Sequence, residues 1–192
     1  NGDLKPGEFL TEKYLVEKLK MSRTPIRAAL ERLVVEGLVK HSPNQGLIVA
    51  ELSLKRAIDI YDIRVALESH VVRKLAARDW TDREKKWFEE NLQKQKQAVE
   101  TRNYEEFTLE DSLFHKQLTR MYENDEIIKI MDNIQDQLYL IAMKVLRKEA
   151  TRIIQSYEDH YKIFECIIHG KGEEAAEEIT KHLEFGKQIL IS

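Results

Sequence analysis

The chain has 192 residues, of which 42% are hydrophobic and 34% charged, a composition typical of a folded protein with a buried core. The sequence has no run of eighteen apolar residues, so we expect no membrane span, and its single cysteine, Cys166, fits the reducing cytoplasm. The net charge of −3 gives no general reason to expect nucleic-acid binding. Residues 1–50 carry eight basic and six acidic residues, whereas residues 51–192 carry 23 and 28. An argument for DNA binding must therefore rest on where the basic residues lie.

The first fifty residues predict two short helices joined by a tight turn. Thr11–Leu19 is amphipathic and Thr11 can cap it, with an apolar side formed by Leu15, Val16 and Leu19. After a break at Lys20 and Met21, Ser22 can cap a second helix, which Gly37 ends in the left-handed conformation. The buried stripe of the second helix is expected to comprise Ile26, Ala29, Leu30, Leu33 and Val34. Two helices in this arrangement indicate a helix-turn-helix.

A β-hairpin is expected directly after the second helix. Two short apolar runs, residues 38–41 and 47–50, flank a turn of Ser42, Pro43, Asn44, Gln45 and Gly46. Beside a recognition helix, this hairpin would be the wing of a winged helix-turn-helix.

Basic and hydroxyl side chains gather at the start of the second helix. Arg23, Thr24 and Arg27 lie in its first turns, opposite the apolar stripe. A recognition helix enters the major groove with its N-terminal residues first, where arginine can pair with guanine and Thr can hold phosphate. The alternative is that both arginines are ordinary solvated residues. The order of turn, caps and hairpin favours DNA binding.

The run from Gly2 to Leu52 resembles the DNA-binding domain of the GntR family of regulators. The matching positions are Gly2, Leu4, Pro6-Gly7, Leu10, Glu12, Leu15, Ser22 to Arg27, Ala29-Leu30, Leu33, Glu36 to Val39 and Gly46. The resemblance implies DNA contacts from Arg23 and Arg27, assisted by Lys13, Ser22, Thr24 and the wing near Gly46. The family usually has a helix before the Gly-x-Leu-x-Pro-Gly segment, inside which this sequence starts. We therefore expect a winged domain over residues 1–52 that lacks part of its first helix.

Residues 53–192 predict helix after helix. Capping signals stand at Thr81, Asn103 and Asn124, and Gly170 and Gly172 mark the last turn. The expected helices are Leu54–Asp79, Asp82–Thr101, Tyr104–Tyr122, Asp125–Glu149, Arg152–His169 and Glu173–Leu190. The fold class is thus mainly α, a winged helix-turn-helix followed by an all-α six-helix bundle.

Four polar residues fall on the apolar stripes of three of these helices. Asp111 and His115 are four residues apart and share one stripe, while His160 and His182 lie on the stripes of the last two helices. These two histidines stand eleven residues before and after Lys171, which is ~16 Å of helix on either side. An antiparallel pair of helices therefore brings them to the same level.

A carboxylate and three imidazoles around one point suit a divalent ion such as zinc, nickel or manganese. The alternative is that each histidine is a satisfied core residue and that Asp111 pairs with a histidine or an arginine. Matched depth on three helices favours the metal. We interpret His41, His70 and His169 as surface or wing residues, and Cys166 as a packing residue.

Residues 54–190 resemble the FCD effector domain of one GntR subfamily, whose pattern carries Asp-x-x-x-His and two later single histidines. All four positions are present, so the resemblance is to the metal-containing branch rather than the acyl-CoA-responsive branch. It implies zinc as the first choice of metal and a small organic-acid effector beside it, such as a sugar acid or a hydroxy- or dicarboxylate. A cavity arginine commonly helps, and Arg64 is the candidate; its alternative role is a surface salt bridge with Glu68.

The sequence therefore predicts a cytoplasmic, homodimeric transcription repressor that binds a palindromic operator under effector control, and not an enzyme. The dimer and effector come from the family resemblance, with residues 53–192 serving effector binding and dimerisation. One alternative is a metal-dependent hydrolase or oxygenase with Glu110 or Glu158 as base, although neither shares a stripe with the four ligands. The other is a DNA-binding protein whose metal is purely structural.

Overall fold

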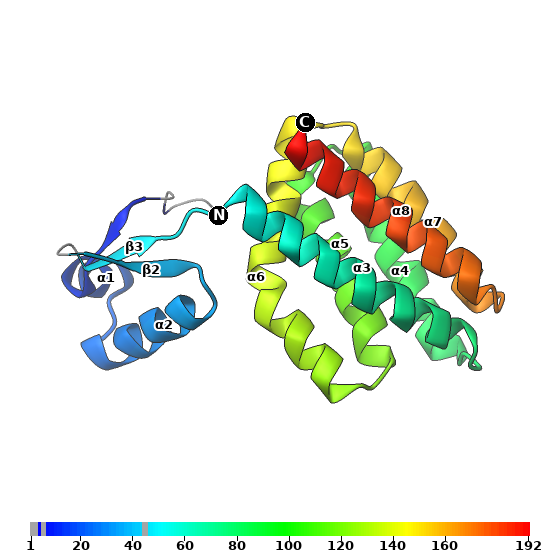
Figure 1. Ribbon diagram of the computed structural model, residues 1–192, viewed down its shortest axis with the longest axis horizontal. Coiled ribbons are helices and arrows are strands. Elements are labelled where there is room, and N and C mark those ends of the chain that lie inside the picture. The colour runs from blue at the N-terminus through cyan, green and yellow to red at the C-terminus, as the bar shows by residue number, and fades with distance from the viewer. Residues whose placement is uncertain (1–3, 5–6, 44–45) are drawn as a thin grey trace. The chain divides into compact units, whose positions relative to one another are not determined.

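The chain divides into two compact units, Asn1–Ser53 and Leu54–Ser192, in a computed structural model that describes residues 4, 7–43 and 46–192 (Figure 1). The first unit combines helices with a small sheet, and the second is all helical. This confirms the mainly α fold class with an N-terminal winged helix-turn-helix. The residues Gly2, Pro6, Asn44 and Gln45, used in the sequence argument, lie outside the described residues.

The first unit has a helix-turn-helix followed by a hairpin. Its elements are β1 (Phe9–Leu10), α1 (Glu12–Leu19), α2 (Arg23–Val35), β2 (Val39–Ser42) and β3 (Gly46–Val49). The sheet is antiparallel in the order β1-β3-β2. The predicted hairpin is confirmed, but β1 was not predicted, because two residues are too short to show an alternating pattern.

The core of the first unit lies between the two helices and the sheet. Its buried residues are Leu10, Leu15, Ile26, Leu30 and Val39. The prediction was wrong for two residues on the apolar faces of these helices: Leu19 of α1 is 53% exposed, and Ala29 of α2 is exposed as well. Gly37 has φ +72°, as the helix end requires, and the amide of Leu38 reaches back to the carbonyl of Leu33.

The second unit is a bundle of the six predicted helices. They are α3 (Leu54–Ala76), α4 (Asp82–Glu100), α5 (Tyr104–Met121), α6 (Asp125–Lys148), α7 (Arg152–Ile168) and α8 (Gly172–Ile191). The predicted caps explain the agreement, since Thr81 and Glu84 form a capping box and the Asn103 and Asn124 side chains accept from first-turn amides. No helix in the described part of the chain is long and apolar enough to cross a membrane.

The bundle core sets the depth of the polar residues. Phe88, Phe114 and Phe164 pack ring against ring, and the Phe114 ring stacks on the imidazole of His160 at 4.5 Å between centroids. Figure 1 shows α3 running beside α8, and Gly186 of α8 is where the ring of Tyr61 from α3 makes its close approach. The inward faces of α3, α5, α7 and α8 therefore meet around one buried region.

Candidate metal centre and DNA-contacting residues

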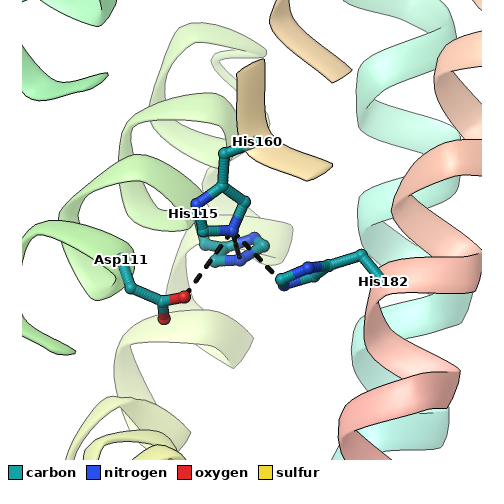
Figure 2. A group of neighbouring side chains, drawn as sticks. All are labelled: Asp111, His115, His160 and His182. Carbon is teal, nitrogen blue, oxygen red and sulfur yellow. Dashed lines mark hydrogen bonds and ion pairs between the residues drawn. The ribbon is translucent and has the colours of Figure 1, made fainter. Parts of the chain in front are cut away.

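The four predicted metal ligands meet at one point in the bundle (Figure 2). Asp111 and His115 come from α5, His160 from α7 and His182 from α8, and their ligand atoms all lie within 4.8 Å of one another. His160 Nε2 is 3.2 Å from His115 Nε2, 3.3 Å from His182 Nε2 and 3.6 Å from Asp111 Oδ1. The structure thus brings together the residues that the helix periodicity had placed at one depth.

All three histidines are buried, and burial keeps His160 and His182 neutral. His160 is fully buried, and His115 and His182 are 3% and 6% exposed. Burial lowers the pKa of His160 well below its usual range. Burial also lowers the pKa of His182 to about 4, although its hydrogen bond with Asp159 opposes the change. A neutral imidazole has the lone pair that a metal ligand needs.

The Nδ1 atom of each histidine is hydrogen-bonded to an oxygen atom outside the cluster. The acceptors are Glu68 Oε2 for His115 (2.5 Å), Gln95 Oε1 for His160 (2.8 Å) and Asp159 Oδ2 for His182 (3.1 Å). An oxygen acceptor requires the proton on Nδ1, so each Nε2 carries a lone pair. The lone pair on His160 Nε2 therefore faces those of His115 at 3.2 Å and His182 at 3.3 Å, and lone pairs at such distances repel one another unless a cation lies among them.

Arg152 contacts the same Nδ1 of His182, and the two contacts compete. A terminal nitrogen of Arg152 lies 2.9 Å from His182 Nδ1 and 3.0 Å from the His182 carbonyl oxygen. Burial alone would raise the pKa of Asp159, but bonds from His182 and Gln155 and the charge of Arg152 lower it to about 2. We assign the Nδ1 proton to this ionised carboxylate and the arginine bond to the carbonyl, because a guanidinium can only donate.

The residues present fit a divalent ion. Zinc binds imidazole nitrogen at roughly 2.0–2.1 Å, so two nitrogens on one ion stand about 3.0 Å apart at a right angle and about 3.4 Å apart at the tetrahedral angle. The observed separations of 3.2 and 3.3 Å lie within this range. Oxygen acceptors on Nδ1 are the usual outer partners of metal-binding histidines. The donor set suits zinc, nickel or manganese.

Arg64 and Glu68 form an ion pair next to the cluster, where Glu68 accepts a hydrogen bond from His115. Arg64 Nε donates to Glu68 Oε1 at 2.6 Å, and the two residues are 7% and 0% exposed. The alternative of a surface salt bridge was therefore wrong, because the pair forms but is buried. Burial raises the pKa of Glu68, yet the charge of Arg64 and the hydrogen bonds from His115 and Arg64 outweigh this effect and bring that pKa to about 2.

Sequence reasoning missed the three acceptors that orient the histidines. Gln95 lies on the buried face of α4 with Asn91, whose side-chain oxygen accepts from it at 2.8 Å. A glutamine and an asparagine four residues apart on an apolar stripe were a signal that could have been used. Glu68 and Asp159 carried a weaker signal, because charged residues beside a stripe are common on exposed helix faces.

A cavity adjoins the cluster, between α6 and the helices α3, α5, α7 and α8. The centres of water molecules can occupy a volume of about 40 Å³ inside this cavity. Its wall includes Asp111, His115 and His182 of the cluster together with Arg64, Tyr61 and Arg152. The predicted effector residue Arg64 therefore does lie at a cavity beside the candidate metal centre.

The predicted DNA-contacting residues lie on the surface of the first unit. Lys13 on α1 and Ser22, Arg23, Thr24 and Arg27 at the start of α2 are exposed, and Gly46 begins β3 with φ +86°. The Ser22 hydroxyl makes no capping bond to α2, so the first amides of that helix are open to a phosphate.

One contact at this surface was not foreseen. Arg27 Nε donates to Glu12 Oε1 on α1 at 2.6 Å. The hydrogen bond from Arg27 lowers the pKa of Glu12, so the carboxylate stays ionised. This pair directs the Nε of Arg27 toward α1.

A winged helix-turn-helix with an exposed basic helix start, followed by a helical bundle with a buried polar cluster, defines a DNA-binding regulator with a sensor domain. Family models agree with this class. Residues 1–49 match the model of bacterial regulatory proteins of the gntR family, and residues 59–185 match the FCD domain.

Similar proteins carry regulatory names. The chain is 30% identical over 180 residues to the Nta operon transcriptional regulator of Aminobacter aminovorans, covering 94% of this chain and 83% of that one. It is 28% identical over 165 residues to the gluconate operon transcriptional repressor of Bacillus subtilis, covering 82% and 67%. The solved structure of E. coli McbR/YncC matches with a TM-score of 0.84 at 24% identity, covering 99% of this chain and 90% of that one, and so shows the fold alone.

The chain belongs to the GntR family of bacterial regulatory proteins and carries an FCD domain. It is a transcription regulator and not an enzyme, and the proposal of a hydrolase or oxygenase is set aside on the relatives' names.

Proposed function

We propose that this protein is a cytoplasmic, homodimeric repressor whose operator binding is controlled by a small organic acid, bound beside a divalent ion held by Asp111, His115, His160 and His182. The observation that carries the sensor half is the convergence of three Nε2 lone pairs whose Nδ1 atoms are all engaged elsewhere. Zinc is the first choice, with nickel or manganese as alternatives.

The ion supplies a fixed positive charge and open coordination positions. Four protein ligands leave one or two positions on a five- or six-coordinate ion, which a carboxylate oxygen can take. Glu68, Gln95 and Asp159 hold the three imidazole rings in the orientation that points Nε2 inward. Arg64 faces the same cavity and supplies a second positive charge to an anionic ligand.

Operator binding would use the start of α2. Arg23 and Arg27 would contact base edges or phosphates in the major groove, with Thr24, Ser22 and Lys13 on the backbone and the segment at Gly46 as the wing. A two-fold dimer would read a palindromic site. The effector must bind one dimer geometry better than the other to change DNA affinity.

The test is metal content of the purified protein by elemental mass spectrometry, beside an Asp111→Ala/His182→Ala double variant. A His169→Ala variant is the matched control, because His169 is exposed at the end of α7. We expect about one divalent ion per chain in wild type and control, and little in the double variant. If none binds even after incubation with zinc, nickel and manganese, the cluster is a polar core network and the sensor half of the proposal fails.

A purely structural metal predicts a different result in the DNA-binding assay. Removing the metal would then unfold the bundle, while adding carboxylates to the metal-loaded protein would leave operator affinity unchanged. A screen of carboxylates in that assay separates the two roles.

A further inference from the structure

The cavity beside the cluster has two chemically different walls. The α6 wall is apolar, with one face of the helix supplying Met131, Leu138, Ile141, Ala142, Val145 and Leu146. Its one polar contribution among the described lining residues is Gln135. The rest of the lining comes from α3, α5, α7 and α8, and its polar members are Tyr61, Arg64, Thr108, Asp111, Ser112, His115, Arg152, Ser156 and His182. A ligand that fills this space therefore meets charge on one side and hydrocarbon on the other.

The polar wall offers donors for one carboxylate. Glu68 takes the Nε of Arg64, and among the described residues the terminal nitrogens of Arg64 have no hydrogen-bond partner. The Tyr61 hydroxyl is likewise without a partner in the described part of the chain, and burial raises the pKa of Tyr61 to about 12, so it remains a donor at neutral pH. Tyr61 and Arg64 are three residues apart on α3 and so face the cavity together.

Both terminal nitrogens of Arg152 already donate to other groups of the protein. One of its terminal nitrogens donates to Asp159 at 3.0 Å and the other to the carbonyl of His182 at 3.0 Å. The charges around the site also favour a ligand with a single carboxylate. Three carboxylates, Asp111, Glu68 and Asp159, face two arginines and the proposed divalent ion, which leaves one net positive charge.

We propose that the effector is a short monocarboxylate with an unsubstituted hydrocarbon tail, rather than a sugar acid or a dicarboxylate. This inference rests on the proposed function, because it assigns the ligand of the same site. The carboxylate lies toward Arg64, Tyr61 and the ion, and the tail lies against α6. A one-charge ligand neutralises the site, and the tail covers apolar surface that would otherwise remain wet.

The size of the cavity limits the tail. At roughly 10–15 Å³ per water centre, the 40 Å³ holds about three waters, and these occupy ~90 Å³ of liquid. That volume is about the size of a four-carbon acid. Hydroxyls of a sugar acid that face α6 would find Gln135 as the one polar lining residue there, and a buried hydroxyl without a partner is strongly disfavoured.

The experiment compares three acids with the same number of carbons. Butyrate, threonate (the trihydroxy acid) and succinate are titrated into the zinc-loaded protein by calorimetry and added to the operator-binding assay. We expect butyrate to bind at least ~10-fold more tightly than the other two. Tyr61→Phe is expected to weaken butyrate binding several-fold while metal content stays unchanged.

The apolar wall is tested with an isosteric change. Val145→Thr places a hydroxyl on α6 without changing side-chain shape, and we expect the preference for butyrate over threonate to fall several-fold. Val72→Thr is the matched control, because Val72 is fully buried but does not line the cavity. An equal shift in both variants would mean that the wall does not select the ligand.

The outcomes separate this inference from the proposed function. Metal-dependent binding that favours threonate or succinate overturns the monocarboxylate and leaves an organic-acid sensor standing. A zinc-loaded protein that binds none of the three, and whose operator affinity no carboxylate changes, overturns both. Tight butyrate binding that disappears with the metal supports both.

Discussion

The close approach of α3 to α8 at Gly186 leads to a quantitative prediction for Gly186→Ala. A Cβ at this position would lie 2.6 Å from the Tyr61 hydroxyl and 3.2 Å from Tyr61 Cζ, where ordinary contacts are 3.4 Å or more. The Tyr61 ring is 5% exposed, so it has little room to move away. Overpacking of this kind costs roughly 1–3 kcal/mol. Replacing glycine by alanine inside a helix contributes up to ~1 kcal/mol in the other direction.

The net expectation is a loss of about 1 kcal/mol in the free energy of unfolding of the bundle. Trp80 and Trp87, which are the two tryptophans of the chain, both lie in the second unit, so tryptophan fluorescence during urea unfolding reports on the bundle. Tyr61→Phe removes the closest atom, and the Gly186→Ala/Tyr61→Phe double variant should recover much of the loss. The coupling between the two sites should be about 1 kcal/mol.

The reasoning fails if Gly186→Ala stabilises the bundle by about 1 kcal/mol, because helix propensity alone would then be acting. It also fails if the two changes are additive. Tyr61→Phe alone is expected to alter stability little, since its hydroxyl has no partner among the described residues.

Three further predictions concern other parts of the chain. Arg23→Ala should cost about 1–3 kcal/mol of discrimination at one operator base, while Arg32→Ala, whose partner is Glu36, should leave the preference unchanged in a binding assay with base-substituted operators. His160→Ala should lower both metal content and melting temperature, and normal metal content would contradict the four-ligand site. Glu84→Gln should weaken the start of α4, with a lower melting temperature at pH 7. The hydrogen bond from Arg78 lowers the pKa of Glu84 to about 2. The ionised Glu84 carboxylate therefore stabilises the fold above pH ~4.5, and this stabilisation is lost as the pH falls toward 2. The melting temperatures of the wild type and Glu84→Gln should converge near pH 2.

The sequence predicted the helices of the bundle closely because their ends are chemically marked. Thr81, Asn103 and Asn124 each accept from a first-turn amide, so the boundary is set by local chemistry rather than by packing. The convergence of the four candidate metal ligands was predicted for a related reason. A polar residue on an apolar stripe must face the interior, whichever helices lie opposite.

The acceptors of the three histidines, Glu68, Gln95 and Asp159, were not predicted because these contacts depend on the register between helices. Gln95 meets His160 across α4 and α7, 65 residues apart, and periodicity within one helix carries no information on that pairing. The same limit explains the wrong environment for Arg64 and Glu68. Their spacing of four residues predicted the ion pair, but the choice between surface and interior depends on which helices cover that face of α3.

The arrangement of α3 bears on how a ligand at the cavity can act on DNA binding. Tyr61, Arg64 and Glu68 lie on one face of α3 and contact the cavity or the cluster, and the same helix begins at Leu54, directly after the winged unit. A ligand changes an equilibrium only through different contacts in the two states. An effector carboxylate on the terminal nitrogens of Arg64 would share the guanidinium with Glu68, which also accepts a hydrogen bond from His115. We therefore expect ligand binding, the orientation of the His115 ring and the position of α3 to be linked through the Arg64–Glu68 ion pair. Arg64→Lys keeps the charge but loses the planar donor geometry, and it should reduce the response of operator binding more than it reduces metal content.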